Sequence, residues 1–215
     1  MSVEAKICGL SEARTMTAAV EAGAAMVGLN FYPPSPRSLT PAKAGRLAKL
    51  APSQVRKVGI FVDAADDAIA TVLAEAEIDL LQLHGAETPA RVAEIKARFS
   101  LPVMKAIAVA ERADIDTAHD YEAVADILLF DAKAPKSMVD ALPGGNGLIF
   151  DWGLLEGRRW QCPWVLSGGL DADNVAEAVR ISGATMVDVS SGVERSPGVK
   201  DSAAIRAFLD AVKRL

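Results

Sequence analysis

Residues 164–190 read WVLSGGLDADNVAEAVRISGATMVDVS, and this stretch decides the fold class. It opens with an apolar run at Trp164–Ser167, passes through a glycine turn into a helical pattern at Asp173–Ser182, and ends in a second apolar run at Met186–Ser190. Two short apolar runs separated by one helical segment predict a βαβ unit, in which the two strands are parallel.

The same alternation extends through the rest of the chain. The expected strands are Val3–Cys8, Met26–Phe31, Val55–Val62, Leu80–His84, Pro102–Ala108, Asp126–Asp131, either Leu148–Phe150 or Trp164–Ser167, and Met186–Ser190. The expected helices are Glu12–Ala22, Pro41–Leu50, Asp66–Ala76, Pro89–Phe99, Asp173–Ser182 and a final helix at Ser202–Arg214. With Trp164–Ser167 as the seventh strand, we predict an α/β protein in which residues 1–215 form one domain, a (β/α)8 TIM barrel with eight parallel strands.

An open doubly wound sheet of the flavodoxin or Rossmann kind shows the same alternation. A dinucleotide fold carries Gly-x-Gly-x-x-Gly where the first strand enters its helix, and residues 9–22 contain no such pattern. The least regular stretch is Asp131–Trp160, which includes PGGNG at residues 143–147. Because it is too long for a plain turn, we expect a functional loop with a short helix there.

Composition excludes several classes of protein. Of the 215 residues, 51% are hydrophobic and 24% charged, which permits a large core, and the formal net charge is −5. The acidic balance disfavours nucleic acid and anionic membranes as partners, and no apolar run reaches the roughly 18 residues of a membrane span. With two cysteines and two histidines, neither a disulfide framework nor a structural zinc site is expected. We expect a cytoplasmic protein that binds no metal.

Polar side chains stand at the carboxyl ends of the expected strands. They are Lys6, Cys8, Asn30, Asp63, Gln82, His84, Lys105, Asp131 and Asp188. Buried parallel strands are usually continuous apolar runs, and a polar group near a core costs free energy unless it is paired or meets a ligand. Any one of these residues can simply end a strand at the surface, but the carboxyl ends of barrel strands converge on one mouth. The whole set therefore predicts an active site there.

Two loops have the composition of a phosphate site. Ser167-Gly168-Gly169-Leu170 follows the seventh strand, and Ser190-Ser191-Gly192-Val193 follows the eighth. Glycines let backbone N–H groups approach an anion, and serine hydroxyls donate further hydrogen bonds. The loops after these two strands are the usual phosphate site of the barrel. We therefore expect Gly168, Gly169, Ser190, Ser191 and Gly192 to bind a phosphate group.

Seven motifs, in order, resemble those of the phosphoribosylanthranilate isomerase family. They are KICGL at 6–10, NFYPPSPR at 30–37, VGIFV at 58–62, LQLHG at 81–85, FDW at 150–152, LSGGL at 166–170 and VDVSSGVE at 187–194. Each motif alone is weak evidence, but together they span nearly the whole chain. The chain departs from the family in its glycine-rich loop, which reads GGNGLI at residues 144–149 where the family often has Gly-Gly-Thr-Gly followed by Lys or Thr.

The resemblance implies an Amadori rearrangement in tryptophan biosynthesis. N-(5-phosphoribosyl)anthranilate, the phosphorylated small-molecule partner, would become 1-(2-carboxyphenylamino)-1-deoxyribulose 5-phosphate. An acid protonates the furanose ring oxygen as the ring opens to a Schiff base, and a base then removes the C2 proton to give an enolamine. No redox step occurs, so the resemblance implies no cofactor.

In the resemblance, Cys8 is the general base and Asp131 the general acid. The residues add an argument of their own for Cys8, since Lys6 lies two positions earlier on the same strand and points to the same side. A nearby ammonium group would lower the pKa of the thiol. Asp131 ends an apolar run, where burial favours the protonated acid. We expect Cys162, in a loop before Pro163, to be structural.

The remaining roles concern binding. Arg37 follows a stiff proline-rich segment and would bind the anthranilate carboxylate through its guanidinium fork. Asp188 resembles the residue that accepts a hydrogen bond from the anilino nitrogen, and it can also hold Lys6 or Arg37 in an ion pair. We expect His84 and Lys6 to contact substrate, and His119 to lie at the surface.

Three alternatives remain at this point. Indole-glycerol-phosphate synthase is typically longer and uses a lysine as acid, and the related histidine-pathway isomerase uses two aspartates where this chain has Cys8 on the first strand. A non-catalytic metabolite-binding barrel would have lost the acid or the base, yet Cys8 and Asp131 are both present. A monomer and a homodimer fit the sequence equally well.

Overall fold

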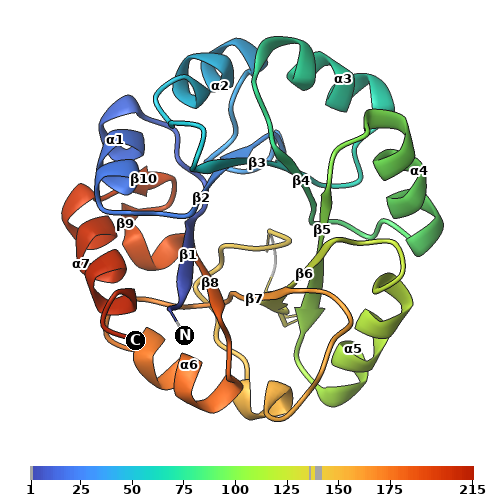
Figure 1. The fold of residues 1–215 in the computed structure, drawn as a ribbon, viewed down its shortest axis with the longest axis vertical. Coiled ribbons are helices and arrows are strands. Elements are labelled where there is room, and N and C mark those ends of the chain that lie inside the picture. The colour runs from blue at the N-terminus through green and yellow to red at the C-terminus, as the bar shows by residue number, and fades with distance from the viewer. Residues whose placement is uncertain (1, 136, 139–141) are drawn as a thin grey trace.

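Eight parallel strands close into a barrel in the computed structural model, which describes residues 2–135, 137–138 and 142–215 (Figure 1). The strands are β1 Glu4–Ile7, β2 Met26–Asn30, β3 Arg56–Phe61, β4 Leu80–Leu83, β5 Val103–Val109, β6 Ile127–Ala132, β7 Trp164–Leu166 and β8 Met186–Val189. β1 pairs with β8, which closes the ring. The predicted barrel is thus confirmed, and Trp164–Leu166, not Leu148–Phe150, is the seventh strand.

Helices surround the barrel between successive strands (Figure 1). They are α1 Ala13–Glu21, α2 Pro41–Ala48, α3 Asp66–Glu75, α4 Pro89–Phe99, α5 Arg112–Asp116, α6 Val175–Ser182 and α7 Ser202–Val212, with 3-10 segments η1 Thr117–Tyr121, η2 Trp152–Leu155 and η3 Ser191–Val193. The N-caps Thr40 and Thr88 accept hydrogen bonds from the first turns of α2 and α4, and proline follows each cap. The short helix expected within Asp131–Trp160 is η2, although residues 136 and 139–141 of that stretch lie outside the described residues.

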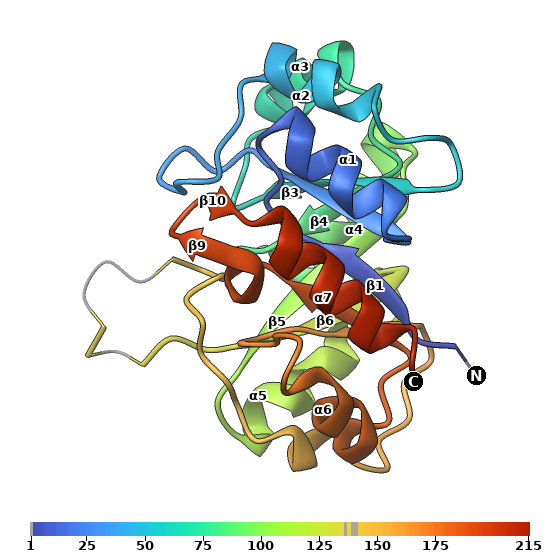
Figure 2. The same ribbon diagram turned by 90° about the vertical axis from the view of Figure 1, so that its left-hand side faces the viewer.

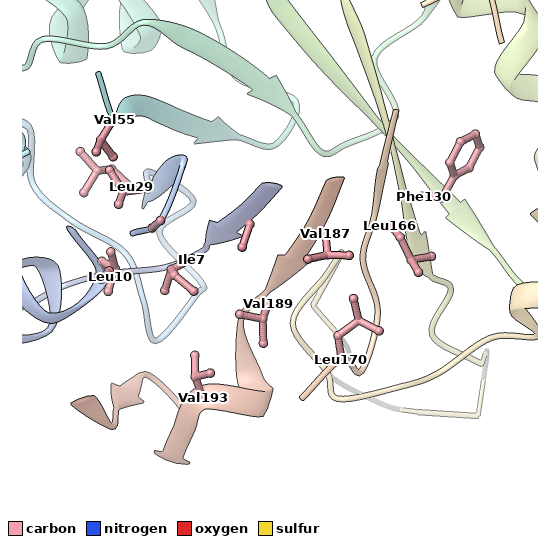
Figure 3. Packing of buried hydrophobic residues seen from close by; sticks show 14 of the residues in the cluster. Ile7, Leu10, Leu29, Val55, Phe130, Leu166, Leu170, Val187, Val189 and Val193 are labelled. Atoms are coloured by element: carbon pink, nitrogen blue, oxygen red, sulfur yellow. The ribbon is translucent and has the colours of Figure 1, made fainter. Parts of the chain in front are cut away.

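Apolar side chains fill two separate regions on opposite faces of the strands. The larger cluster packs the strands against the helices, and Figure 3 shows Ile7, Leu29, Leu166 and Val187 among its members. The smaller cluster fills the barrel, and its members are Met26, Val58, Leu80, Met104, Ala106, Ile127, Leu129, Val165 and Met186. Because strand side chains alternate between faces, the positions two residues beyond these inner side chains also face the barrel axis. On β4, β6, β7 and β8 these positions carry the polar residues Gln82, Asp131, Ser167 and Asp188.

The loops at the two ends of the barrel differ. The hairpin of β9 Glu194–Ser196 with β10 Val199–Lys200 lies at one end, while the C-terminus and the first described residues lie at the other (Figure 2). The hairpin follows η3 directly and was not predicted. Within the described part of the chain, no helix has the length and apolar character to cross a membrane.

Candidate active site

A cavity opens at the carboxyl ends of the strands. Nine of the predicted site residues line it: Cys8, Arg37, His84, Asp131, Gly168, Gly169, Asp188, Ser190 and Ser191. They come from six different strands or the loops that follow them, so the fold assembles the cavity from distant parts of the chain. Lys6 and Gly192 were predicted to touch substrate, but both lie outside the lining.

Lys6 lies beneath the cavity floor and not in it. Its side chain is 0% exposed, and its Nζ donates to Asp188 Oδ1 at 2.9 Å. Ser167 Oγ donates to the other oxygen of Asp188 at 3.0 Å. Burial opposes the charge of Lys6, but Asp188 and Cys8 together outweigh it, and the pKa of Lys6 is raised. The ion pair considered for Asp188 is therefore formed with Lys6.

The thiol of Cys8 occupies a tight site on the floor. Gly28 on the neighbouring strand leaves room for it, because a Cβ built there would lie 3.2 Å from Sγ and 3.1 Å from the Cys8 Cα. Burial raises the pKa of Cys8 above its ordinary value; the charge of Lys6 lowers it, and Asp188 partly cancels that effect. Lys6 is where the sequence predicted it to be, but the predicted net lowering of the thiol pKa is wrong because desolvation exceeds the attraction.

Asp131, on β6, lines the same cavity as Cys8 and is held by its surroundings. Oδ1 accepts the backbone N–H of Ala132 at 2.9 Å, and Oδ2 lies 3.3 Å from His84 Nε2. The backbone of Gly144 covers this pair, since a Cβ there would lie 2.6 Å from Asp131 Oδ2 and 2.8 Å from His84 Nε2. The glycine-rich loop thus covers the carboxyl group closely with its backbone, and a side chain at residue 144 would require one of these groups to shift.

Arg37 lines the cavity, and its guanidinium group is held by contacts that the sequence did not predict. Its Nε and Nη2 donate to the two carboxylate oxygens of Glu194 at 2.7 and 2.8 Å, and Nη2 also donates to the carbonyl oxygen of Gly145 at 3.1 Å. Lys200 Nζ donates to Glu194 Oε1 at 2.7 Å and to the carbonyl oxygen of Ser190 at 2.8 Å. Glu194 lies in one of the seven motifs and could have been singled out there, whereas nothing in the sequence pointed to Lys200.

The two loops expected to bind phosphate meet at one side of the cavity. Gly168 and Gly169 both have positive φ, +89° and +61°, which side-chain-bearing residues rarely adopt. Gly192 packs against the carbonyl oxygen of Leu170, where a Cβ would come closer than 3.0 Å. Gly192 thus brings the two loops together without facing the cavity, while Ser190 and Ser191 are part of the lining.

Lys105 and Asp63 were expected at the mouth, but both lie outside the cavity lining and support the neighbouring loops. Lys105 lies between the inward-facing Met104 and Ala106, so its side chain points away from the barrel axis. Its Nζ donates to Glu87 Oε2 at 2.8 Å and to the Gly85 carbonyl oxygen at 2.6 Å. Glu87 Oε1 accepts the backbone N–H of Asp63 at 2.9 Å. The buried ion pair of Lys105 and Glu87 therefore connects the loops after β3 and β4, next to His84.

The other predicted residues lie away from the cavity. The side chain of His119 is half exposed and stacks near Trp160, and Cys162 packs against the outer core. Among the residues that the structure describes, no three His, Cys, Asp or Glu side chains are placed to hold a metal ion together.

Comparison with known proteins gives one family. The model of the family described as N-(5'phosphoribosyl)anthranilate (PRA) isomerase matches residues 5–211. The proteins named N-(5'-phosphoribosyl)anthranilate isomerase from Paramagnetospirillum magneticum and Paracoccus denitrificans are 57% and 58% identical to the chain, over 99% and 97% of it and 98% and 96% of themselves.

Solved structures agree with the sequence comparison. The phosphoribosyl anthranilate isomerase of Thermotoga maritima has a TM-score of 0.88 and 36% identity, covering 99% of this chain and 100% of that one. A phosphoribosyl anthranilate isomerase in complex with reduced 1-(o-carboxyphenylamino)-1-deoxyribulose 5-phosphate has a TM-score of 0.85 and 34% identity, with the same coverage.

Proposed function

The chain belongs to the N-(5'-phosphoribosyl)anthranilate isomerase family, and we propose that Cys8 and Asp131 are the general base and general acid of its reaction. The enzyme isomerises N-(5'-phosphoribosyl)anthranilate to 1-(2-carboxyphenylamino)-1-deoxyribulose 5-phosphate, a step of tryptophan biosynthesis. The observation that supports the two roles is that a thiol and a carboxyl group from β1 and β6 line the same cavity, beside a guanidinium group and a pair of glycine- and serine-containing loops.

The acid acts first. Asp131 gives its proton to the furanose oxygen while the C1–O bond breaks and the anilino nitrogen forms a Schiff base with C1. The backbones of Gly144 and Gly168 lie against the two oxygens of this carboxyl group and limit the access of water to it. His84 Nε2, 3.3 Å from Oδ2, lies where it can stabilise the carboxylate that remains.

The base acts second. Cys8 removes the C2 proton of the Schiff base, and the electron pair moves into the C1–C2 bond to give the enolamine, which tautomerises to the ketose. Because burial raises the pKa of the Cys8 thiol, the free enzyme holds mostly thiol at neutral pH. A protonated Schiff base next to Cys8 would lower that pKa, so the base becomes competent when the first step is complete.

Binding groups surround these two residues. Arg37 binds the anthranilate carboxylate, with Glu194 orienting the guanidinium group from behind. Asp188, held by Lys6 and Ser167, accepts the anilino N–H. The phosphate group binds the backbone N–H groups of the loop at Gly168–Gly169 and the loop at Ser190–Ser191. Binding both ends of the substrate places C1 and C2 between the thiol and the carboxyl group.

The roles of Cys8 and Asp131 are tested by turnover of substrate generated in situ, followed through loss of anthranilate-type fluorescence. Cys8→Ala and Asp131→Asn should each lower kcat at least ~100-fold, the scale for removing a general acid or base. Cys162→Ala and the exposed Asp120→Asn are the matched controls and should keep full kcat. A Cys8→Ala or Asp131→Asn enzyme with normal kcat would remove that residue from the mechanism.

We also propose that residues 1–215 act as one domain in the cytoplasm and that the chain is a monomer or a homodimer. A solved structure of monomers generated from the dimeric phosphoribosylanthranilate isomerase of Thermotoga maritima is 34% identical to this chain. The two structures have a TM-score of 0.84, covering 99% of this chain and 100% of that one. Sedimentation of the purified chain decides between the two states, and a larger particle would contradict both.

A further inference from the structure

We propose that Gln82 is a positioning residue that holds His84 as the Nε2–H tautomer, so that His84 donates a hydrogen bond to the carboxyl group of Asp131. This inference rests on the proposed role of Asp131 as the general acid. It assigns a purpose to Gln82, a polar side chain that is fully buried inside the barrel yet outside the cavity lining.

The geometry joins three residues from two strands. Gln82 and His84 are two positions apart at the end of β4, so both side chains face the barrel axis. Gln82 Nε2 lies 2.8 Å from His84 Nδ1, and His84 Nε2 lies 3.3 Å from Asp131 Oδ2 on β6. The imidazole ring therefore lies between a buried amide and the proposed acid, with one ring nitrogen facing each.

The amide determines which nitrogen carries the proton. An amide nitrogen can only donate, so Gln82 Nε2 requires a lone pair on Nδ1, and the single proton of a neutral ring is then on Nε2. The reversed amide would turn Oε1 toward Nδ1 and leave the NH₂ group buried in its place. In the described part of the chain Oε1 has no hydrogen-bond partner. A buried carbonyl without a partner is tolerated better than buried N–H donors, so the orientation with the donating amide is the more stable one.

The tautomer determines where the proton of the acid is available. With Nδ1–H, the ring would present a lone pair to Asp131, and the carboxyl proton would point to His84 instead of the substrate. With Nε2–H, that proton stays free for the ring oxygen, and His84 stabilises the carboxylate formed when it leaves. A hydrogen bond to an ionised acceptor is roughly twice as strong as a neutral one, so it strengthens as charge develops on Asp131.

Nitrogen-15 NMR of the imidazole rings tests the tautomer without any turnover. The chain has two histidines, so His119→Asn assigns the signals of His84 directly. The expected result is a protonated Nε2 and an unprotonated Nδ1 in the free enzyme at neutral pH. A protonated Nδ1, in either the other tautomer or the imidazolium ion, would overturn the proposal. Because no substrate is present, this result does not depend on whether Asp131 is the acid.

Kinetics test the consequence. Gln82→Met keeps the size of the side chain and removes the amide, and we expect kcat to fall about 10-fold or more with KM changed less than about 2-fold, in line with the loss of a group that orients an active-site residue. The variant should keep the Tm of the wild type, since it also removes a buried polar oxygen that has no partner among the described residues. Full kcat in folded Gln82→Met would refute the positioning role.

A double-mutant cycle separates this proposal from the acid assignment. If Gln82 acts through Asp131, then Gln82→Met in an Asp131→Asn background should lower kcat no further, whereas independent effects would multiply. If kcat of the double variant falls by the product of the two single effects, the inference is contradicted, even when both single variants are slow. Normal kcat in Asp131→Asn alone would instead overturn the acid assignment and leave the tautomer measurement to stand by itself.

Discussion

Removal of the negative charge of Glu194 should lower both the stability of the protein and its affinity for substrate. Its two oxygens contact Arg37 at 2.7 and 2.8 Å and Lys200 at 2.7 Å, and Gly198 donates its N–H at 3.1 Å. All three charged side chains are nearly inaccessible, at 4%, 5% and 1% exposure for Glu194, Arg37 and Lys200. Glu194→Gln keeps the shape but leaves two buried cations facing a neutral amide.

The expected cost follows from the burial. Loss of one partner of a buried ion pair costs ~3–5 kcal/mol, and because glutamine keeps one accepting oxygen we expect about 3 kcal/mol near pH 7. The released guanidinium group should also bind the substrate carboxylate less well, which raises KM about 10-fold, the equivalent of ~1.4 kcal/mol. The exposed Glu177, which contacts Arg180 at 3.7 Å, provides the control, and Glu177→Gln should cost less than about 0.5 kcal/mol.

The pH dependence gives the sharper test. The hydrogen bonds from Arg37 and the charge of Lys200 overcome burial and hold the pKa of Glu194 below its ordinary value, so its contribution is present above ~4.3 and lost as pH falls through the folded-state pKa. Burial lowers the pKa of Lys200 even with Glu194 present. In the variant Lys200 sheds its proton more easily, so stability recovers as pH rises toward the unfolded-state value of ~10.4.

The stability difference between wild type and Glu194→Gln should therefore be largest between about pH 5 and 8 and smaller on both sides. Urea unfolding followed by tryptophan fluorescence, repeated from acid to alkaline pH, measures it. A difference below about 1 kcal/mol at pH 7, or one that does not change with pH, would refute the reasoning that the carboxylate holds two buried cations.

Three further predictions concern groups around the cavity. In a Cys162→Ser background, the rate of alkylation of Cys8 should still be rising above the ordinary thiol pKa of ~8.5, because burial raises the pKa of Cys8; a plateau below pH 8 would contradict this. Gly192→Ala and Gly45→Ala each place a Cβ closer than 3.0 Å to a backbone carbonyl oxygen, but only the first lies between the two proposed phosphate loops. If a displacement near 1 Å follows, Gly192→Ala should lower kcat/KM about 100-fold and weaken inhibition by inorganic phosphate, while Gly45→Ala lowers only the Tm; equal kinetics in the two variants would separate Gly192 from phosphate binding. Gly144→Ala should lower kcat with little change in Tm, since its Cβ would lie 2.6 Å from the proposed acid, and an unchanged kcat would show that the loop moves aside.

Much of the fold could be predicted because its signals are local. The Thr-Pro pairs at residues 40–41 and 88–89 mark where α2 and α4 begin, and each strand is a short apolar run. The short helix α5 and the β9–β10 hairpin could not be predicted. α5 has five residues and one buried side chain, Ile115, too few to show a helical period. The hairpin strands have only three and two residues, too few to show a strand pattern, and they carry the buried ion pair of Glu194 and Lys200.

The site was predicted less completely, because it depends on two properties that cannot be read from the sequence. The first is which face of each strand points into the barrel. Lys6 and Lys105 are both buried lysines within apolar strands, yet Lys6 faces the barrel axis below the cavity and Lys105 faces the helices. In VMKAIAV at residues 103–109 both faces are apolar, so no alternation shows which one is inside until the barrel closes.

The second property is the balance between burial and charge. The sequence correctly placed an ammonium group beside the Cys8 thiol, but the sign of the pKa shift depends on how much water the barrel excludes and on whether the ammonium is already paired. Lys6 is paired with Asp188, a residue 182 positions away, and this neutralises much of its effect on the thiol. Asp188→Asn should therefore lower the pKa of Cys8 and speed its alkylation at neutral pH, because the remaining ammonium charge would then act on the thiol alone. Slower or unchanged alkylation would show that Lys6 gives up its proton when Asp188 is neutralised, which would make the ion pair the sole support of the lysine charge in the barrel.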